Sequence, residues 1–373
     1  MRSRSAVFAL LATLVAYLVW SVFWPFATWQ VRGSGLLLIA LIFAVVAWVP
    51  LVYWKSSSEE TSRRQRFLLG MAYGGLGWLS FLLILTLARD LAAWISPFPL
   101  RTPEGIAAVL GASGLLFGIG LLGAQFGVRI KRVTIPLKNF PRELAGLKII
   151  QITDLHVGPT IRREFVKQVV HLANQAEADL IVVTGDVADG MVSDLRDEIA
   201  PLSELRAKLG KFYVPGNHEY YWEGAAWIDR MKSLGFTALL NSHQIVESSG
   251  RRFAIAGISD PAAVAARCEG PDLVKAARGI PCDAFPKILL CHQPQFAEST
   301  AKEGFDLQIS GHTHGGQFFP WTWIAARVHR HNHGLHRLGN LSIYVSRGTG
   351  YWGPPVRLGA PPEVTLIVLQ PID

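Results

Sequence analysis

The sequence predicts two parts, a helical membrane domain followed by an α/β domain built on two packed β-sheets. Three observations lead to this fold class. Half of the 373 residues are hydrophobic and only 17% are charged, which is unusual for a soluble protein. The long apolar stretches all lie near the start of the chain. After residue 128, short β-branched runs alternate with helical patterns, and strands crowd together late in the chain.

Four uncharged stretches are each long enough to cross a bilayer, because roughly 20 apolar residues span a hydrocarbon core of about 30 Å. They cover residues 5–24, 33–54, 67–88 and 105–128. A signal peptide or buried core helices are the alternative explanations. Arg2 and Arg4 resemble the start of a secretory signal, but no small-residue cleavage site follows and three more stretches come afterwards. We therefore expect a transmembrane domain of four helices over residues 1–127.

Lysine and arginine in the short loops predict how this domain is oriented. One side would carry nine of these residues and the other side three. The nine are Arg2, Arg4, Lys55, Arg63, Arg64, Arg66, Arg129, Lys131 and Arg132, and the three are Arg32, Arg89 and Arg101. This excess predicts that both chain ends, and the second domain with them, lie in the cytoplasm.

The net charge of +8 does not indicate a nucleic-acid partner. Residues 1–127 hold nine Lys or Arg against four Asp or Glu, so +5 of the charge flanks the predicted spans, where it suits anionic headgroups. No dense basic stripe or nucleic-acid motif appears elsewhere. The cysteines Cys268, Cys282 and Cys291 lack metal-type spacing and fit a reducing compartment.

Residues 128–373 form the second predicted domain. Its expected strands are residues 128–135, 147–153, 180–184, 211–214, 252–256, 287–290, 306–309, 341–345 and 363–369. Its expected helices are residues 162–176, 194–208 and 225–234. Strands that alternate with helices favour an open α/β sheet, in which ligands bind at the carboxyl ends of the strands.

Five short polar motifs each follow one of the apolar runs. They are Asp154-Leu155-His156; Gly185-Asp186 with Asp189 three residues on; Gly216-Asn217-His218-Glu219; His292-Gln293-Pro294; and Gly311-His312-Thr313-His314-Gly315-Gly316. Each motif alone has an ordinary explanation, such as a loop, a turn, a helix cap or a surface histidine. All five together, each at the end of a strand, indicate one shared site.

The residue types in these motifs suit a metal centre. Residues two apart in Asp-x-His and His-x-His point the same way on an extended strand end, so both can reach one centre. Carboxylate and amide oxygens mixed with imidazole nitrogens suit Mn, Fe, Zn or Co, and no thiolate is offered. One carboxylate must bridge if two metals lie about 3.5–4 Å apart. The neighbouring glycines allow close approach of the backbone.

On these motifs, residues 128–373 resemble the calcineurin-like metallophosphoesterase superfamily, whose five blocks read D-x-H, GD, GNH[ED], H and GHxH. The segments TDLHVG, VTGDVADG, VPGNHEYY, CHQP, SGHTHGGQFFP and YVSRGTGYWGPPVR are similar to a bacterial membrane-associated branch. That branch includes enzymes that cleave UDP-2,3-diacylglucosamine. The resemblance implies two mixed β-sheets packed face to face and flanked by helices.

The resemblance also implies a role for each block residue. Asp154, His156 and His314 would hold one metal, Asn217, His292 and His312 would hold the other, and Asp186 would bridge both. His218 would contact the phosphate and protonate the leaving group. The two divalent or trivalent ions, Mn, Fe or Zn, would stabilise the charge on the phosphate and lower the pKa of a water.

Several other features have two explanations each. Arg347 would bind substrate phosphate or form a structural ion pair, and Asp189 would orient a ligand or make a turn. Cys291 is expected in the core. A histidine-rich segment is either a solvated basic loop or a third metal site; it contains His329, His331, His333 and His336. The apolar residues 318–324 either pack inside the domain or enter the bilayer interface.

The resemblance implies an enzyme that hydrolyses a phosphodiester or pyrophosphate bond in a lipid or lipid-linked nucleotide sugar. UDP-2,3-diacylglucosamine diphosphatase activity, a step of lipid A biosynthesis, is the best guess. The alternatives are a tethered phosphodiesterase or phosphatase of soluble nucleotides or phosphoesters, and a membrane sensor with a structural metal site. We expect a multi-pass protein of a bacterial inner membrane, with the membrane and a lipid substrate as partners rather than nucleic acid.

Overall fold

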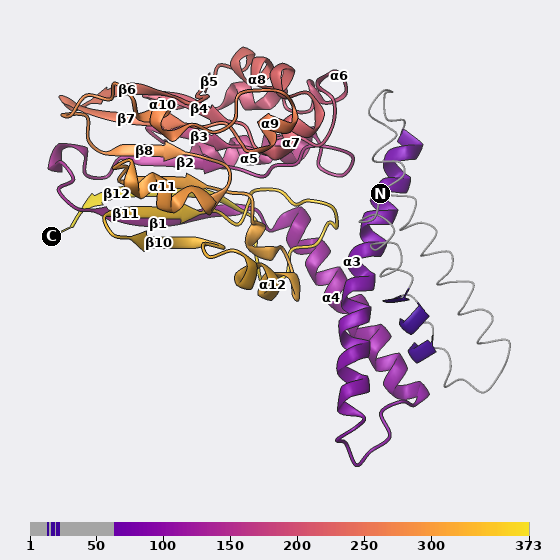
Figure 1. The fold of residues 1–373 in the computed structure, drawn as a ribbon. Coiled ribbons are helices and arrows are strands. Elements are labelled where there is room, and N and C mark those ends of the chain that lie inside the picture. Colours follow the sequence, from indigo (N-terminus) through magenta and orange to yellow (C-terminus); the bar gives the residue numbers. More distant parts are fainter. Residues whose placement is uncertain (1–12, 15, 19, 23–62, 373) are drawn as a thin grey trace. The chain divides into compact units, whose positions relative to one another are not determined.

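The computed structural model describes residues 13–14, 16–18, 20–22 and 63–372. The chain divides into two compact units, Met1–Leu122 with Gly353–Val356 and Gly123–Trp352 with Arg357–Asp373. The first unit holds the apolar helices, and the second holds two β-sheets with shorter helices (Figure 1).

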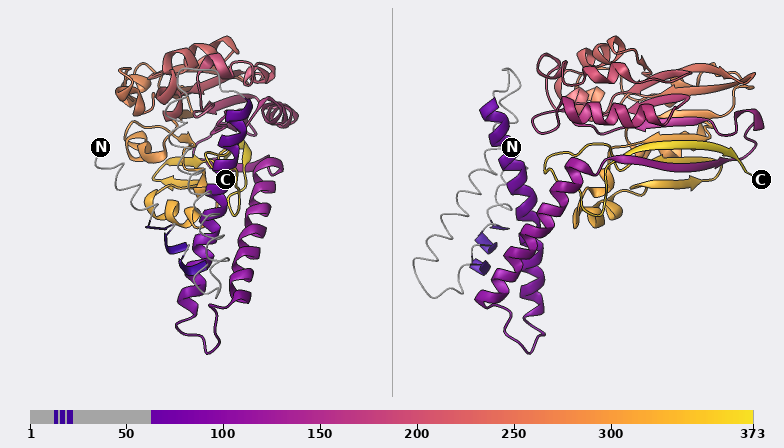
Figure 2. Two further views of the ribbon diagram at one scale, coloured as in Figure 1. Left: turned by 90° about the vertical axis from the view of Figure 1, so that its right-hand side faces the viewer. Right: turned by 180° about the vertical axis from the view of Figure 1, so that it is seen from behind.

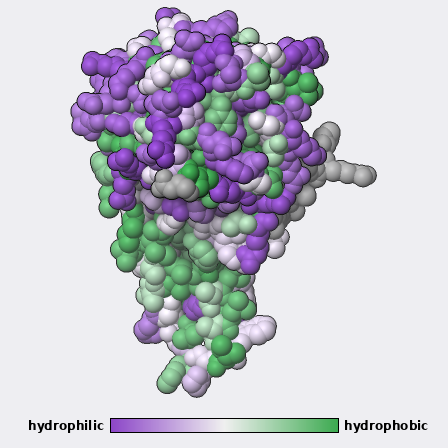
Figure 3. Space-filling view, turned by 90° about the vertical axis from the view of Figure 1, so that its left-hand side faces the viewer, coloured by the Kyte–Doolittle hydropathy of each residue, from purple (hydrophilic) through white to green (hydrophobic). Residues whose placement is uncertain are grey.

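Two long helices carry two of the four predicted membrane spans. Helix α3 (Arg63–Ala92) contains the predicted span 67–88, and helix α4 (Pro103–Phe126) contains most of the predicted span 105–128. By length and composition both can cross a membrane. Figure 3 shows hydrophobic, green residues concentrated on the lower part of the molecule, with smaller green areas elsewhere. Helix α4 ends at Phe126 instead of Val128, because glycine at 127 is a poor helix former and a strand begins at Arg129.

The other two predicted spans lie wholly or largely outside the described residues. Residues 33–54 lie outside them entirely, and the described residues of the span 5–24 are helical. The part of the chain that the structure describes therefore contains two candidate spans, and the predicted number of four is not confirmed.

The first sheet has the strand order β1-β12-β2-β3-β4-β5. Its strands are β1 (Arg129–Leu137), β2 (Lys148–Ile152), β3 (Leu180–Thr184), β4 (Gly210–Val214), β5 (Thr237–Ala238) and β12 (Glu363–Pro371). All neighbours are parallel except β12 and β2. The carboxyl ends of β2, β3 and β4 therefore lie at the same edge of the sheet.

The second sheet has the strand order β10-β11-β9-β8-β7-β6. Its strands are β6 (Ser242–Ser248), β7 (Arg251–Gly257), β8 (Lys287–Leu290), β9 (Leu307–Ser310), β10 (Gly334–Leu338) and β11 (Leu341–Val345). The four inner strands are parallel, and each outer strand is antiparallel to its neighbour. The prediction of two mixed sheets is confirmed, and Figure 2 shows them as stacked layers.

Alternation along the strands explains why the sheets stack. In β3, Leu180 and Val182 face a core shared with the second sheet, whereas Ile181 and Val183 face a core on the outer side. In β8, Ile288 and Leu290 join the shared core. Because successive side chains point to opposite faces, an all-apolar strand such as β3 is buried on both sides. Its five residues are all buried.

Helices cover the outer faces of both sheets. Helix α5 (Arg163–Gln175) contacts β1 and β12, and α8 (Gly224–Ser233) contacts β5. Helix α10 (Leu273–Ala277) contacts β6 and β7, and α11 (Ala297–Lys302) contacts β10 and β11. The remaining short helices and 3-10 turns are α6 (Val192–Leu195), α7 (Asn217–Trp222), α9 (Ala262–Ala265), α12 (Trp321–Val328), Arg142–Leu144, Ala200–Glu204, Pro294–Phe296 and His314–Gly316.

The predicted helix over residues 194–208 is wrong. Helix α6 ends at Leu195, and a separate 3-10 turn with Pro201 in its first turn follows at Ala200–Glu204. Proline lacks a backbone N–H and disfavours helical geometry in the residue before it, so one continuous helix cannot form here. The other two predicted helices are present as α5 and α8, and all nine predicted strands are present.

Candidate metal centre

The five sequence motifs all lie at the carboxyl ends of parallel strands. Asp154 and His156 follow β2, Asp186 follows β3, and Asn217 and His218 follow β4 in the first sheet. His292 follows β8, and His312 and His314 follow β9 in the second sheet. Contacts between these side chains show that the two sheet edges meet, so the five motifs share one site.

Three groups of side chains among the described residues bring possible ligand atoms close together. The first donor group is Asp154, His156 and His314, and the second is Asp186, His292 and His312. The third, His156, Asp189 and His218, shares His156 with the first. In the first, the Nε2 atoms of His156 and His314 lie 3.0 Å apart, and Asp154 Oδ1 lies 3.4 Å from His314 Nε2. In the second, His292 Nε2 lies 3.1 Å from Asp186 Oδ2 and 3.2 Å from His312 Nδ1.

Asp186 belongs to the second donor group and also lies close to the first. Its Oδ2 atom is 3.1 Å from His292 Nε2 and 3.7 Å from His156 Nε2. Its Oδ1 atom accepts the backbone N–H of His218 at 2.9 Å, which fixes the carboxylate. A bridging ligand must have this position between two groups of donors.

The donors fit a pair of divalent ions. The Asn217 side chain is buried, and within the part of the chain that the structure describes its Oδ1 atom has no hydrogen-bond partner. A buried acceptor without a partner is costly, so an unpaired amide oxygen here needs a cation or another partner. Imidazole nitrogens with hard carboxylate and amide oxygens suit Mn, Fe or Zn. The seven residues expected to hold metals therefore have side chains whose chemistry suits a pair of ions, and their individual roles stay a prediction.

The backbone around these residues is strained. Five of the seven expected ligands have φ in the left-handed region, at 53° for Asp154, 50° for His156, 52° for Asp186, 75° for His312 and 52° for His314. Such values are uncommon outside glycine and cluster at functional sites. The expectation that strand alternation brings each pair together is wrong, because these pairs lie on left-handed loop residues instead of an extended strand end.

Two glycines permit close packing of the loops. A Cβ atom on Gly216 would lie 2.2 Å from Asp186 Oδ1, and one on Gly311 would lie 2.3 Å from Asp154 Oδ2. No other residue fits without moving the carboxylate. Both glycines therefore set the positions of acidic side chains in the site.

Asp189 contacts two functional histidines with one oxygen. Its Oδ1 atom lies 3.1 Å from His156 Nδ1 and 2.5 Å from His218 Nδ1. Burial opposes protonation of His218, but the carboxylates of Asp189 and Asp186 outweigh it and raise the pKa of His218 to about 9. Asp189 thus directs the Nε2 atom of His156 toward the first donor group and keeps a proton on His218.

Glu219 is a structural residue of the site for which the sequence suggested no role. Its buried carboxylate accepts the backbone N–H groups of Gly216 at 2.6 Å, Asp186 at 3.0 Å and Val187 at 2.6 Å. It therefore ties the loop after β3 to the start of α7. The available sequence signal was a glutamate three residues after the residue that caps a helix.

Arg357 was also missed. Its buried guanidinium donates to His314 Nδ1 at 2.9 Å and to the backbone carbonyls of Arg347 at 2.7 Å and Gly350 at 2.9 Å. Burial and this neighbouring positive charge lower the pKa of His314 well below its usual value. A neutral imidazole is the form that binds metal. An arginine in a proline- and glycine-rich loop gave no sequence sign of this contact.

Arg347 and Cys291, which lie outside the metal-binding motifs of the sequence, have different surroundings. Arg347 is partly buried, with its side-chain carbons beside Gly315, and its Nε atom has no hydrogen-bond partner among the described residues. Cys291 is buried in the outer core of the second sheet, and burial raises the pKa of its thiol to about 12.

The histidine-rich segment lies beside the site without forming a metal group among the described residues. The ring centroids of His331 and His336 lie 5.0 Å apart, and those of His329 and His312 lie 6.1 Å apart. His329 and His331 also line a cavity of about 360 Å³ with residues of α11.

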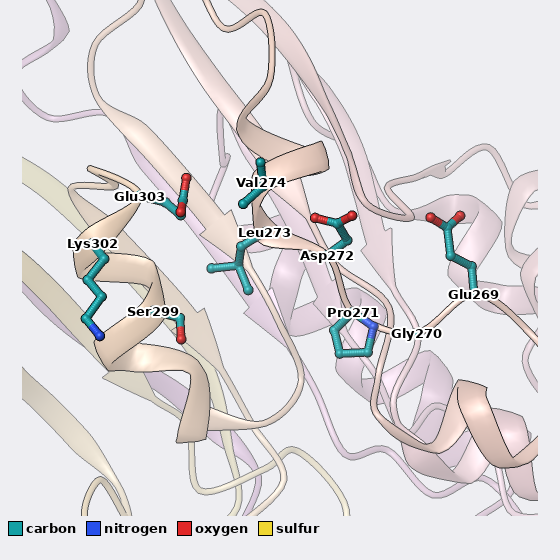
Figure 4. Close-up of a pocket in the computed structure, with 9 residues that line it drawn as sticks. All are labelled: Glu269, Gly270, Pro271, Asp272, Leu273, Val274, Ser299, Lys302 and Glu303. Atoms are coloured by element: carbon teal, nitrogen blue, oxygen red, sulfur yellow. The ribbon is translucent and has the colours of Figure 1, made fainter.

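A larger cavity of about 530 Å³ contains none of the predicted site residues. Figure 4 shows it between residues 269–274 and helix α11, which contributes Ser299 and Lys302. This cavity therefore contributes nothing to the metal centre.

Comparison with known proteins agrees with this site. Residues 147–316 match the family described as calcineurin-like phosphoesterase, a range that includes all seven expected ligands. A transmembrane protein with metallophosphoesterase domain from Danio rerio is 36% identical over 260 residues, which cover 67% of this chain and 59% of that protein. This chain therefore spans about three fifths of the length of that relative.

Two bacterial relatives are covered almost completely. An uncharacterized metallophosphoesterase of Aquifex aeolicus is 31% identical over 277 residues, which cover 71% of this chain and 98% of that protein. The uncharacterized metallophosphoesterase YkuE of Bacillus subtilis is 30% identical over 279 residues, covering 72% of this chain and 96% of that protein. The fold and the donor groups define a class of phosphoesterase domains with a dinuclear divalent metal site. The chain belongs to the calcineurin-like metallophosphoesterase family.

Proposed function

We propose that this protein hydrolyses a phosphodiester or pyrophosphate bond in a membrane lipid or a lipid-linked nucleotide sugar. One observation carries the hydrolase assignment: Asp186 of the second donor group also lies close to His156 of the first, with a histidine held for proton transfer beside them. A structural metal site would not need His218 oriented by Asp189.

Different residues of the site would have different roles in hydrolysis. Two divalent ions would be held by the two donor groups and Asn217, and they would neutralise the phosphate and activate water. In the reaction, a water oxygen bonds to phosphorus while the bond from phosphorus to the leaving oxygen breaks. His218 gives its proton to that departing oxygen, since the carboxylates beside it keep it protonated near neutral pH. Arg347 would bind a phosphate oxygen through its unpaired Nε.

A lipid substrate is supported by features near the site. Helix α4 ends at Phe126 and β1 begins at Arg129, so only two residues separate a candidate span from the phosphoesterase fold. Helix α12 directly follows the last motif and exposes Trp321 and Trp323, at 48% and 54%. Large aromatic side chains of this kind are favoured at membrane interfaces.

The finer proposal is UDP-2,3-diacylglucosamine diphosphatase activity in lipid A biosynthesis, on the cytoplasmic side of a bacterial inner membrane. The excess of Lys and Arg on one side of the predicted spans supports this orientation. The test incubates full-length protein and Mn²⁺ with UDP-2,3-diacylglucosamine and measures UMP and lipid X. Release of both is expected, and it should be absent in Asp186→Asn. Hydrolysis of soluble phosphodiesters alone would favour the soluble-nucleotide alternative.

The exposed tryptophans of α12 give a second test of the lipid assignment. Trp321→Ser with Trp323→Ser should lower activity on a lipid substrate in bilayers by about tenfold, because each exposed indole loses apolar contact with lipid. Activity on a soluble aryl phosphate should not change. Equal loss on the two substrates would contradict a lipid-specific role for α12.

A further inference from the structure

Two exposed aromatic rings flank the predicted proton donor. The ring of Tyr221 lies 5.3 Å from the ring of His218, and the ring of Trp352 lies 5.7 Å from it, centroid to centroid. His218 is buried, at 6% exposure, whereas Tyr221 is 64% and Trp352 50% exposed. Large aromatic side chains this exposed beside a buried polar group are typical of surfaces that bind a ligand.

Both rings are held by the elements that carry the metal-binding motifs. Tyr221 lies three residues after His218 in α7, so both side chains lie on the same face of that helix. The backbone N–H of Trp352 donates to Gln317 Oε1 at 2.8 Å, and Gln317 Nε2 donates to the carbonyl of Trp352 at 3.1 Å. Because Gln317 directly follows the turn at His314–Gly316, the position of Trp352 is fixed to the last motif.

We propose that Tyr221 and Trp352 form the subsite for the leaving group, and that this subsite takes a leaving group with an apolar ring face, such as an aryl or nucleoside group. The proposal rests on the hydrolysis proposed above. An ester oxygen of a phosphate bound against the His218 ring lies next to that ring, so the group attached to that oxygen lies beside Tyr221 and Trp352. Stacking of its ring would remove both aromatic side chains from water.

The subsite predicts a preference that depends on the leaving group alone. The test uses two diesters of methyl phosphate, one with a 4-nitrophenyl leaving group and one with a hexafluoroisopropyl leaving group, which has no ring. Full-length wild type, Tyr221→Ala and Trp352→Ala are assayed with Mn²⁺. We expect kcat/KM for the aryl diester to fall about tenfold in each variant, while the other diester changes less than about twofold.

Matched variants distinguish the loss of stacking on the leaving group from a general loss of activity at the metal centre. Tyr221→Phe and Trp352→Phe keep a ring and should retain the wild-type ratio of the two rates. Val274→Ala removes an exposed apolar side chain from α10 and should change neither rate. Equal losses on both diesters, or no loss on the aryl diester, would overturn the subsite. If wild type hydrolyses neither diester but releases UMP and lipid X from UDP-2,3-diacylglucosamine, the subsite proposal fails and the hydrolysis proposed above stands. If it hydrolyses none of the three substrates, both proposals fail.

Discussion

The first and second donor groups differ in what holds their histidines. In the first group, charged side chains position both histidines, with Asp189 at Nδ1 of His156 and Arg357 at Nδ1 of His314. In the second group, His292 binds the main chain, since its Nδ1 lies 2.8 Å from the carbonyl of Thr184. A carbonyl at a fixed strand end cannot be removed by mutation, but a charged side chain can. The first group should therefore be more sensitive to substitution of its supporting residues.

The two supporting residues of the first group carry opposite charges. Asp189 accepts from His156 Nδ1, as is usual for a metal-bound histidine, and so orients its ring. Arg357 donates to His314 Nδ1 and lowers the pKa of that imidazole. The first group thus depends on one anionic and one cationic side chain. We expect it to bind its ion less tightly than the second group when Asp189 is changed.

The largest effect is expected from Asp186→Asn. This substitution should affect the two donor groups alike, because Asp186 contacts histidines of both. Loss of the carboxylate charge that contacts His156 and His292 should abolish activity and lower the metal occupancy of both sites. Activity with Mn²⁺ and metal content by mass spectrometry check this. Exposed Asp197→Asn serves as the control and should leave both values unchanged. Wild-type activity in Asp186→Asn would contradict the shared role.

Asp189→Asn should have the next largest effect, with kcat lower by about 10²-fold or more, because it affects His156 and His218 together. The pH profile gives a separate readout. Asp189 raises the pKa of His218, and the acid works only when protonated, so its loss should move the alkaline limb of kcat to lower pH. A uniform loss of kcat without a shift would indicate that Asp189 only supports the fold.

Arg357→Met should reduce both stability and metal binding in the first group. It leaves the buried carbonyls of Arg347 and Gly350 without a donor, at a cost of about 1–3 kcal/mol each. We expect a lower Tm and loss of about one metal ion per chain. Arg357→Lys keeps a charge but not the planar group of donors, so it should recover only part of both. Unchanged metal content in Arg357→Met would argue against any role in positioning His314.

The smallest effect is expected from Thr184→Val, which tests whether the second donor group depends on a main-chain carbonyl instead of a side chain. The hydroxyl of Thr184 accepts from Gln151, but the carbonyl that binds His292 remains. Gln151 keeps a second bond, to the carbonyl of Ser310 at 2.8 Å. Activity should therefore stay within about threefold of wild type and metal content should not change. A loss as large as that of Asp189→Asn would show that the second group also depends on side chains.

The sequence was most informative where local patterns agree with tertiary structure. All nine predicted strands exist because apolar runs such as residues 180–184 are buried on both faces. The order of the motifs at strand ends located Asp154 and His314 at one site although they are distant in sequence. The edge strands β5, β6 and β10 were missed, since their partly exposed residues lack a continuous apolar run.

The supporting contacts could not be predicted, because they depend on loops that meet only in the folded chain. Arg357 reaches His314 from a loop 43 residues away, and Glu219 reaches the loop after β3 from a separate motif. Left-handed φ values at Asp154 and His156 likewise arise from tertiary packing, which overrides the strand-like pattern of Asp-x-His. Local sequence carries little information about such long-range contacts.

Metal stoichiometry tests the central claim most directly. Full-length protein, dialysed against excess Mn²⁺ and then metal-free buffer, should retain about two ions per chain, because two donor groups lie side by side and Asp186 is close to histidines of both. Asp154→Ala and Asn217→Ala should each retain about one ion, and Asp186→Ala should retain fewer than either. A single ion in the wild type, or two ions that persist without Asp186, would contradict a shared dinuclear centre.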